Sequence, residues 1–150
     1  MTDWLVVMSA DNWEICASER LLGLGRDAER RLNRMIGDDR VWIYVNRLYV
    51  DRALPVVGEI RGVARVAGSV RHLDKIPWKP RGSQRFEYAR AIEVERRYAF
   101  PARHLLRTMS FAGRPPYWAA SLLNAPVRLA EKDVHTLETA ASAVGPPAQG

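Results

Sequence analysis

Residues 56–73, VVGEIRGVARVAGSVRHL, decide the fold expected of this chain. Apolar and polar side chains alternate along the stretch, as they do in a strand that buries one face. Gly58, Gly62 and Gly68 interrupt the alternation. Glycines inside a strand mark bends or bulges of the kind that curl a sheet into a barrel. The stretch therefore predicts a long, bent strand in a curved sheet.

Three further segments predict strands of the same sheet. Residues 3–8, DWLVVM, form a short apolar run typical of a buried strand, and residues 40–50, RVWIYVNRLYV, are rich in β-branched and aromatic side chains. Residues 84–100, QRFEYARAIEVERRYAF, alternate over a long span. The side chains of this last strand that point inward are either Phe86, Tyr88, Arg90 and Ile92 or the complementary set.

Short helices are expected between and after these strands. Residues 9–22, SADNWEICASERLL, begin with a cap at Ser9 or Asp11, and Glu14 is placed to close a box with Asp11. Trp13 and Cys16 share the face through which this helix packs. Three more helical segments are residues 26–35, residues 101–111 starting at Pro101, and residues 129–144 with a stripe of Val134, Leu137 and Ala141.

The pattern predicts an α+β domain on a small, closed or nearly closed barrel of about five to six strands, flanked by short helices. Residues 1–143 are expected to form a single domain, and residues 144–150 a disordered tail.

Length and composition exclude several classes of protein. A chain of 150 residues is long enough to bury a core without covalent staples. No apolar run approaches the ~20 residues that span a bilayer, and the first residues lack the features of a signal peptide. The single cysteine, Cys16, excludes an intramolecular disulfide. We therefore expect a cytoplasmic protein with no membrane partner, and its oligomeric state stays open.

The positive charge is concentrated in the middle of the chain. The net charge is +6, and residues 61–114 carry 13 basic and 4 acidic side chains, a net of +9. Residues 1–60 have a net charge of −2 and residues 115–150 of −1. A concentrated basic region is the electrostatic footprint of a phosphate-bearing partner.

Trp78 stands out at the centre of this basic region, in the segment IPWKPRG at residues 76–82. Two prolines and a glycine make a continuous helix or central strand unfavourable there, so the segment is a loop. An indole that projects from such a loop among cations suits a nucleobase with its phosphate. The alternative is an indole that folds back to fill a gap in the core, and the loop alone leaves both open.

The remaining residues offer aromatic surfaces rather than catalytic groups. The three histidines are scattered without metal-ligand spacing, no phosphate-binding glycine loop is present, and Cys16 is interpreted as a small buried hydrophobe. We expect no catalytic residue, metal or cofactor. Trp118 lies in a second proline-flanked loop, where it either joins Trp78 around a base or plugs the barrel mouth. The other tryptophans, Trp4, Trp13 and Trp42, are expected in the core.

The order and spacing of these segments resemble an EVE domain over roughly residues 3–142. EVE domains belong to the PUA-like superfamily and are similar to the YTH domains, which read methylated adenine in RNA. The segments that carry the resemblance are WLVVMSADNWE (4–14), RDAERRLNRMIGDD (26–39) leading into VWIYV (41–45), VGEIRGVARV (57–66), IPWKPRGSQRFEYARAIEV (76–94), LLRTMSFAGRPPYWAASL (105–122) and EKDVHTLE (131–138).

This resemblance implies a PUA-like barrel with a pocket for a modified or flipped-out base. In the YTH relatives an aromatic cage closes around the base, and Trp78 falls at the position of one cage tryptophan. The first cage tryptophan, at the end of the first helix, is replaced here by Leu22, which supplies an apolar wall without a π face. Ser9 and Asn12 match polar pocket positions, and Trp118 and Ser121 match the tryptophan-containing loop of EVE domains.

The expected function is a non-enzymatic module that binds a modified base, such as a methylated one, in DNA or RNA. The alternatives are a pocket for a free nucleoside-like small molecule and a ribonuclease on a PUA-like fold, against which the scattered histidines argue. The expected apolar walls are Trp78, Trp118 and Leu22, and the groups that bond the base edge are Ser9, Asn12 and Ser121. The expected phosphate contacts are Lys79, Arg81, Arg85 and Arg114.

Overall fold

A computed structural model of the chain describes residues 1–80, 82, 86–112, 122 and 125–144. Within these residues the backbone forms a single seven-stranded sheet in the order β2-β6-β4-β3-β1-β7, with β5 paired to β6. The strands are β1 (Asp3–Ser9), β2 (Leu21–Leu24), β3 (Arg40–Arg47), β4 (Val56–Val66), β5 (Arg71–His72), β6 (Tyr88–Pro101) and β7 (Val127–Arg128). The helices are α1 (Ala10–Glu19), α2 (Ala28–Leu32), α3 (Arg103–Arg107) and α4 (Glu131–Val144).

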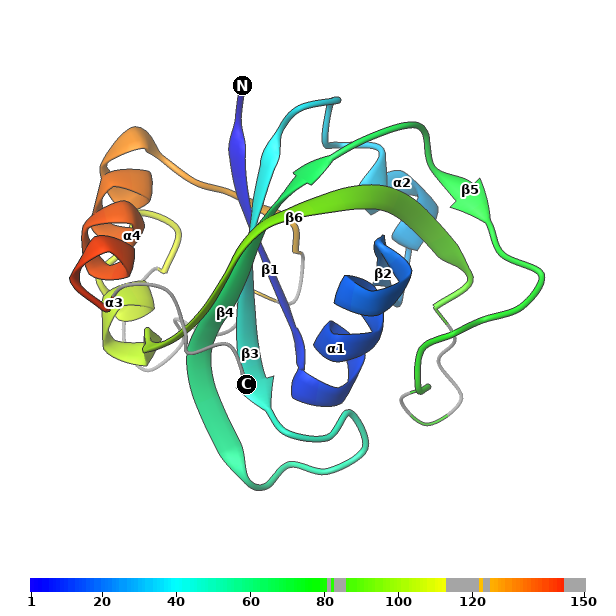
Figure 1. The fold of residues 1–150 in the computed structure, drawn as a ribbon, viewed down its shortest axis with the longest axis horizontal. Coiled ribbons are helices and arrows are strands. Elements are labelled where there is room, and N and C mark those ends of the chain that lie inside the picture. The colour runs from blue at the N-terminus through cyan, green and yellow to red at the C-terminus, as the bar shows by residue number, and fades with distance from the viewer. Residues whose placement is uncertain (81, 83–85, 113–121, 123–124, 145–150) are drawn as a thin grey trace.

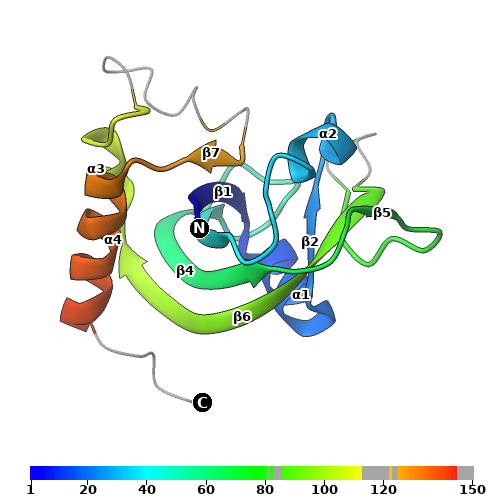
Figure 2. The same cartoon turned by 90° about the horizontal axis from the view of Figure 1, so that it is seen from above.

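The sheet is mixed and strongly curled, as Figures 1 and 2 show. β1 runs parallel to β3, whereas β3 pairs with β4, and β4 with β6, in antiparallel fashion. β7 pairs with β1 only at Trp4 and Leu5, so the last residues of β1 have no partner on that side among the described residues. α1 leaves the sheet at this open side and returns as β2. The expected α+β fold with a curved barrel and short helices is therefore confirmed.

The two faces of the sheet bury two apolar clusters, one beneath α1 and α2 and the other beneath α3 and α4 (Figure 2). Successive side chains of β3 point to opposite faces, so Ile43 joins the first cluster and Trp42 the second. Trp4, Trp13 and Trp42 are all buried, as expected. Gly62 lies so close to Trp13 that a Cβ there would come within 2.5 Å of the indole.

Glycines do mark the irregular points of the predicted long strand. The pairing register of β4 shifts between Ile60 and Gly62, and Gly68, at φ +61°, lies between the end of β4 and β5. The stretch 56–73 is therefore two strands and not one. In β6, Arg90 and Ile92 are buried and Tyr88 is half-buried, as is Phe86 just before the strand, but Ala89 of the complementary set is also fully buried. Burial along this strand therefore does not follow one alternating set.

The predicted helix over 9–22 is too long. Arg20 adopts a left-handed conformation, at φ 57°, and ends α1; the following residues form β2, in which Leu21 pairs with Ala91 of β6. A strand partner distant in sequence thus overrides the local helical pattern. Glu14 closes no capping box, because it forms an ion pair with Arg97.

Two other helix predictions differ from the structure. α2 is shorter than predicted, Ala28–Leu32, and Pro101 ends β6 instead of starting a helix. The final helix, α4, follows its prediction closely: Leu137 and Ala141 are buried, and the helix includes Val144. Residues 145–150 of the expected tail, and most of the loop at 113–126, lie outside the described residues.

Candidate functional site

A cavity of about 640 Å³ opens between the end of β1, α1 and the edge strand β2. Ligand pockets commonly have volumes of about 300–1,000 Å³, so the space suits a nucleoside-sized group. Its apolar wall consists of Val7, Met8, Leu24, Val50, Trp78, Phe86 and Leu122. Its polar and charged lining includes Ser9, Asn12, Asn46, Asp27, Arg26, Arg30, Arg31 and Arg47.

Trp78 lines this cavity as a buried wall and does not project into solvent. The side chain is 4% exposed, and its Nε1–H donates a hydrogen bond of 3.1 Å to Sγ of Cys16. One part of the ring lies against Gly23, where a Cβ would come within 2.7 Å of the indole. The indole therefore folds back, as the second alternative for this loop required, yet it remains part of the cavity surface.

Cys16 behaves as the buried small hydrophobe that was expected. Burial raises the pKa of its thiol to about 11, against hydrogen bonds from the Gly23 backbone and Trp78 that lower it. The thiol is consequently neutral near pH 7. It serves as the acceptor that orients the indole above it.

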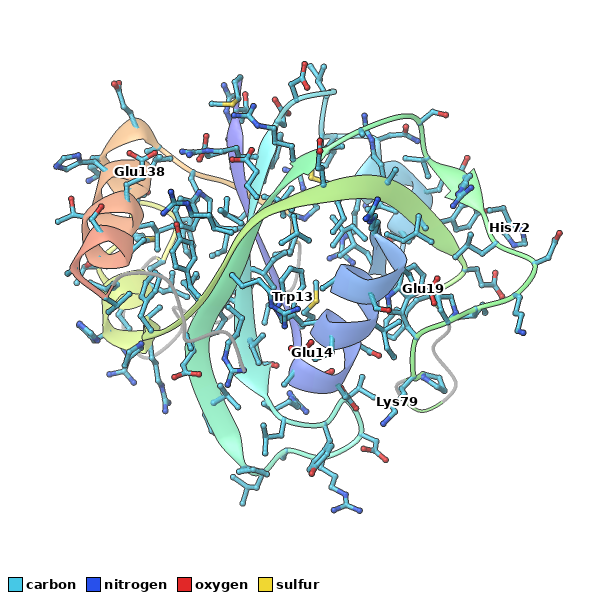
Figure 3. All side chains as sticks on the ribbon, viewed as in Figure 1. Trp13, Glu14, Glu19, His72, Lys79 and Glu138 are labelled. Atoms are coloured by element: carbon cyan, nitrogen blue, oxygen red, sulfur yellow. The ribbon has the colours of Figure 1, made fainter. Side chains whose placement is uncertain are left out.

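Asn12 holds the Trp78 loop in place. Its Oδ1 accepts a hydrogen bond of 2.9 Å from the backbone N–H of Lys79, and its Nδ2 donates one of 3.1 Å to the Lys79 carbonyl. Lys79 Nζ lies 3.7 Å from Oδ2 of Asp11, and Figure 3 shows Lys79 beside the first turn of α1. Asn12 and Lys79, expected to contact a base and a phosphate, thus already bind each other and α1.

The other predicted site residues divide into three groups. Ser9 lines the cavity, and its hydroxyl donates to Oδ1 of Asp11. Leu22 is fully buried in the core and is not among the cavity-lining residues, whereas Gly23 and Leu24 are. The remaining five, Trp118, Ser121, Arg81, Arg85 and Arg114, lie outside the described residues.

Four arginines around the cavity were missed by the sequence analysis. Arg26, Arg30 and Arg31 come from α2 and the turn before it, and Arg47 ends β3. Within the part of the chain that the structure describes, the Arg26 and Arg47 side chains form no hydrogen bond or ion pair. Among the described residues, the Arg30 side chain forms one exposed ion pair, with Asp27 at 3.6 Å. Three of these arginines lie in the segment 23–34, GLGRDAERRLNR. Its net charge is small, because Asp27 and Glu29 offset part of the arginine charge.

Arg31 lines the cavity close to other arginines, whose like charges contribute to the shift of its pKa. Burial is the largest cause that lowers the pKa of its guanidinium; Asp27 opposes this effect, and Arg34 and Arg30 add to it. Arg31 also donates to the backbone carbonyls of Ala125 and Arg26. An anion at the cavity rim would relieve the repulsion among these like charges.

The cavity joins an aromatic and aliphatic wall to a cationic rim, a combination that suits a planar group attached to an anion. No group of three His, Cys, Asp or Glu side chains that could hold a metal ion occurs among the described residues. None of the helices in that part of the chain is long and apolar enough to cross a membrane.

Solved structures with the same fold include YTH domains and a hypothetical protein. The YTH domain of the Zygosaccharomyces rouxii MRB1 protein, in complex with N6-methyladenosine RNA, matches with a TM-score of 0.64 at 12% identity, over 99% of this chain and 89% of that one. The MmI1 YTH domain matches with a TM-score of 0.63 at 9% identity, over 96% and 97% of the two chains. A hypothetical protein from Leishmania major gives 0.57 at 11% identity, over 97% and 98%.

Identities this low show the fold and not the activity. No protein-family model matches the sequence, and no curated protein does.

Proposed function

We propose that the protein is a non-enzymatic EVE-type module that binds a modified base of a DNA or RNA strand in the cavity beside Trp78. The observation that carries the proposal is the continuity of that cavity, in which the indole of Trp78 and the guanidinium groups of Arg26 and Arg47 belong to one lining. The indole suits the base, and the guanidinium groups of the two arginines suit its phosphates.

The geometry favours a pocket with partial aromatic walls over a closed aromatic cage. Trp78 packs on Gly23 with part of its ring, so it offers a base at most one stacking face, a contribution of about 1–3 kcal/mol. Phe86 is the other aromatic side chain in the described lining. Leu24 and Val50 supply aliphatic surface elsewhere in the lining. The Ser9 hydroxyl donates to Asp11, so it offers the base edge its oxygen as an acceptor. Asn12 acts through the loop that it holds.

Methylated adenine is the first ligand to test, because one structure of the same fold contains N6-methyladenosine RNA. The test measures fluorescence anisotropy with RNA and DNA strands of about 12 nucleotides that carry one N6-methyladenine or none. We expect tighter binding of a modified strand, with the free nucleoside, measured by calorimetry, at least about tenfold weaker because it lacks phosphates.

A pair of conservative variants separates the site from general stability. Trp78→Phe removes the indole N–H that Cys16 accepts, and Trp42→Phe removes an equally buried indole that donates to Asp3 on the other side of the sheet. We expect Trp78→Phe to weaken strand binding by about tenfold and Trp42→Phe to leave it unchanged. Absence of binding to any strand would contradict the proposal, and so would equal effects of the two variants.

Equal affinity for the free nucleoside and the strand would instead favour a small-molecule pocket.

A further inference from the structure

The loop that joins β3 to β4 exposes apolar side chains next to the cavity. Tyr49 is 42% exposed, Leu54 71% and Val56 54%. Only six large apolar residues are exposed in the described part of the chain, and these three fall within eight consecutive positions. Isolated exposed apolar side chains are ordinary, but a cluster of them marks a contact surface.

The base of this loop is fixed to the site. Asp11 N–H donates to the Leu48 carbonyl at 3.0 Å, and Leu48 N–H donates to the Pro55 carbonyl at 3.3 Å. Val50 N–H lies 3.4 Å from Oδ2 of Asp11. Figure 1 shows the loop beyond the ends of β3 and β4, beside the start of α1.

The loop is also continuous with the cavity wall. Arg47 and Val50 line the cavity, and Leu54 follows Val50 by four residues, which is at most about 14 Å of chain. The apolar tip of the loop, residues 49–56, is therefore held within reach of any nucleotide that places its base in the cavity.

The chemistry of the tip suits a base-paired strand better than a single one. Proteins that hold single strands stack bases on aromatic rings, whereas Leu54 and Val56 are aliphatic and the Arg52 guanidinium lies over the ring of Tyr49. Aliphatic side chains and proline serve as wedges between base steps of a duplex. Arg47 precedes residues 49–56 and Arg52 lies within them, and Asp51 is the one acidic residue of this segment. The Arg52 guanidinium carbon lies 5.4 Å from the centre of the Tyr49 ring. The tip thus combines an apolar point with cations suited to phosphates.

We propose that residues 49–56 form a wedge, with Leu54 at its point, that enters the base stack of a duplex when the target base turns into the cavity. Turning a base out of a duplex costs the free energy of unpairing and unstacking it. An aliphatic side chain in the vacated position offsets part of this cost, because it excludes water from the exposed base faces. The inference rests on the proposed function and makes its ligand a double-stranded nucleic acid.

The test compares Leu54→Ser with Ile36→Ser. Ile36 is 73% exposed and Leu54 71%, so both changes remove a similar apolar side chain from the surface. Ile36 precedes β3 and Leu54 follows it, and the eight residues of β3 separate its two ends by roughly 23 Å. Thermal melting of both variants would show that they remain folded.

The probes are short DNA and RNA duplexes with one central N6-methyladenine, and the same modified strands alone. We expect Leu54→Ser to weaken duplex binding by about tenfold while single-strand binding stays within about twofold. Ile36→Ser should change neither. With 2-aminopurine next to the methylated base, the wild-type protein should raise the fluorescence of the duplex by unstacking it, and Leu54→Ser should not.

The outcomes separate this inference from the proposed function. Binding of modified single strands without duplex binding would overturn the wedge and leave the proposed function standing. Equal duplex affinity of the wild type and Leu54→Ser would also overturn it, as expected if the tip instead contacts a protein. A wild type that binds no modified strand in any form would overturn both.

Discussion

At Gly23 the backbone of β2 runs directly against the indole of Trp78. A Cβ built there would lie 2.7 Å from two ring carbons and 2.9 Å from a third, which is closer than side chains tolerate. The residue opposite Trp78 is therefore glycine for a steric reason. This contact, together with the hydrogen bond to Cys16, fixes the indole as a wall of the cavity.

The change Gly23→Ala tests this packing. We expect it to lower the free energy of unfolding by about 1–3 kcal/mol, because the added methyl group forces the indole out of its position. The matched control is Gly37→Ala, since a Cβ at Gly37 meets nothing within 4 Å. Urea denaturation measures both, and equal stabilities of the two variants would contradict the packing described.

At the residue scale, the sequence pointed to several residues that line the cavity but not to the contacts that they make. The proline-flanked loop and its family position pointed to Trp78, and Trp78, Ser9 and Asn12 do share the cavity lining. Whether an indole projects or folds back depends on what lies beneath it. Here that is Cys16 and Gly23, from α1 and β2, and no local pattern around residue 78 contains this information.

At the scale of elements, the first turn of α1 organises both loops of the site. Asp11 binds the β3–β4 loop through Leu48 and Val50, and Asn12 binds the Trp78 loop through Lys79. A single short helix thus positions the indole on one side and the apolar tip on the other.

Removal of the Asn12 amide should loosen one of these loops selectively. In Asn12→Ala the N–H and carbonyl groups of Lys79 lose their hydrogen-bond partners on Asn12. This should lower the local stability of the loop by about 1–3 kcal/mol. Amide hydrogen exchange at Lys79 should become at least about fivefold faster, and strand affinity should fall with it. Asn33→Ala is the control, because Asn33 donates within α2, to the Glu29 carbonyl. Unchanged exchange at Lys79 would show that Asn12 does not hold the loop.

The periodicity of apolar side chains predicted most helices and strands. It failed where a segment distant in sequence pairs with a stretch that has a helical pattern. The strands at residues 3–9, 40–47 and 88–101 and the final helix follow the pattern of apolar side chains. Residues 21–24 instead have helix-compatible local sequence and become β2, because β6 offers them a ladder of backbone hydrogen bonds. The extra stabilisation comes from a partner about seventy residues away, beyond any local window.

At the scale of the whole molecule, the cavity gathers positive charge from a segment that is acidic on average. Residues 61–114 hold the excess charge of the chain, yet the cavity arginines, Arg26, Arg30, Arg31 and Arg47, come from residues 1–60. In the described lining these four arginines face a single acidic residue, Asp27, which pairs with Arg30. The electrostatic surface of the site is therefore a product of tertiary structure.

The salt dependence of binding tests this arrangement. Replacement of Arg26 and Arg47 by Gln should reduce the slope of log affinity against log salt concentration by about 1.5, because each phosphate contact contributes about 0.7–0.9. The matched control replaces Arg96 and Arg128 by Gln, two exposed residues of β6 and β7 outside the cavity lining. Anisotropy titrations at several salt concentrations measure the slopes. Equal slopes for the two double variants would contradict an anion site at the rim.

Alternation and helical spacing record which side chains face a core, so the sequence predicts the curved sheet, most of its helices and the burial of Trp4, Trp13 and Trp42. The packing of Trp78 on Gly23, the core position of Leu22 and the four arginines around the cavity depend on tertiary contacts instead. A cavity is lined by segments far apart in the chain, and its shape and charge depend on how those segments pack. Local patterns carry no record of that packing.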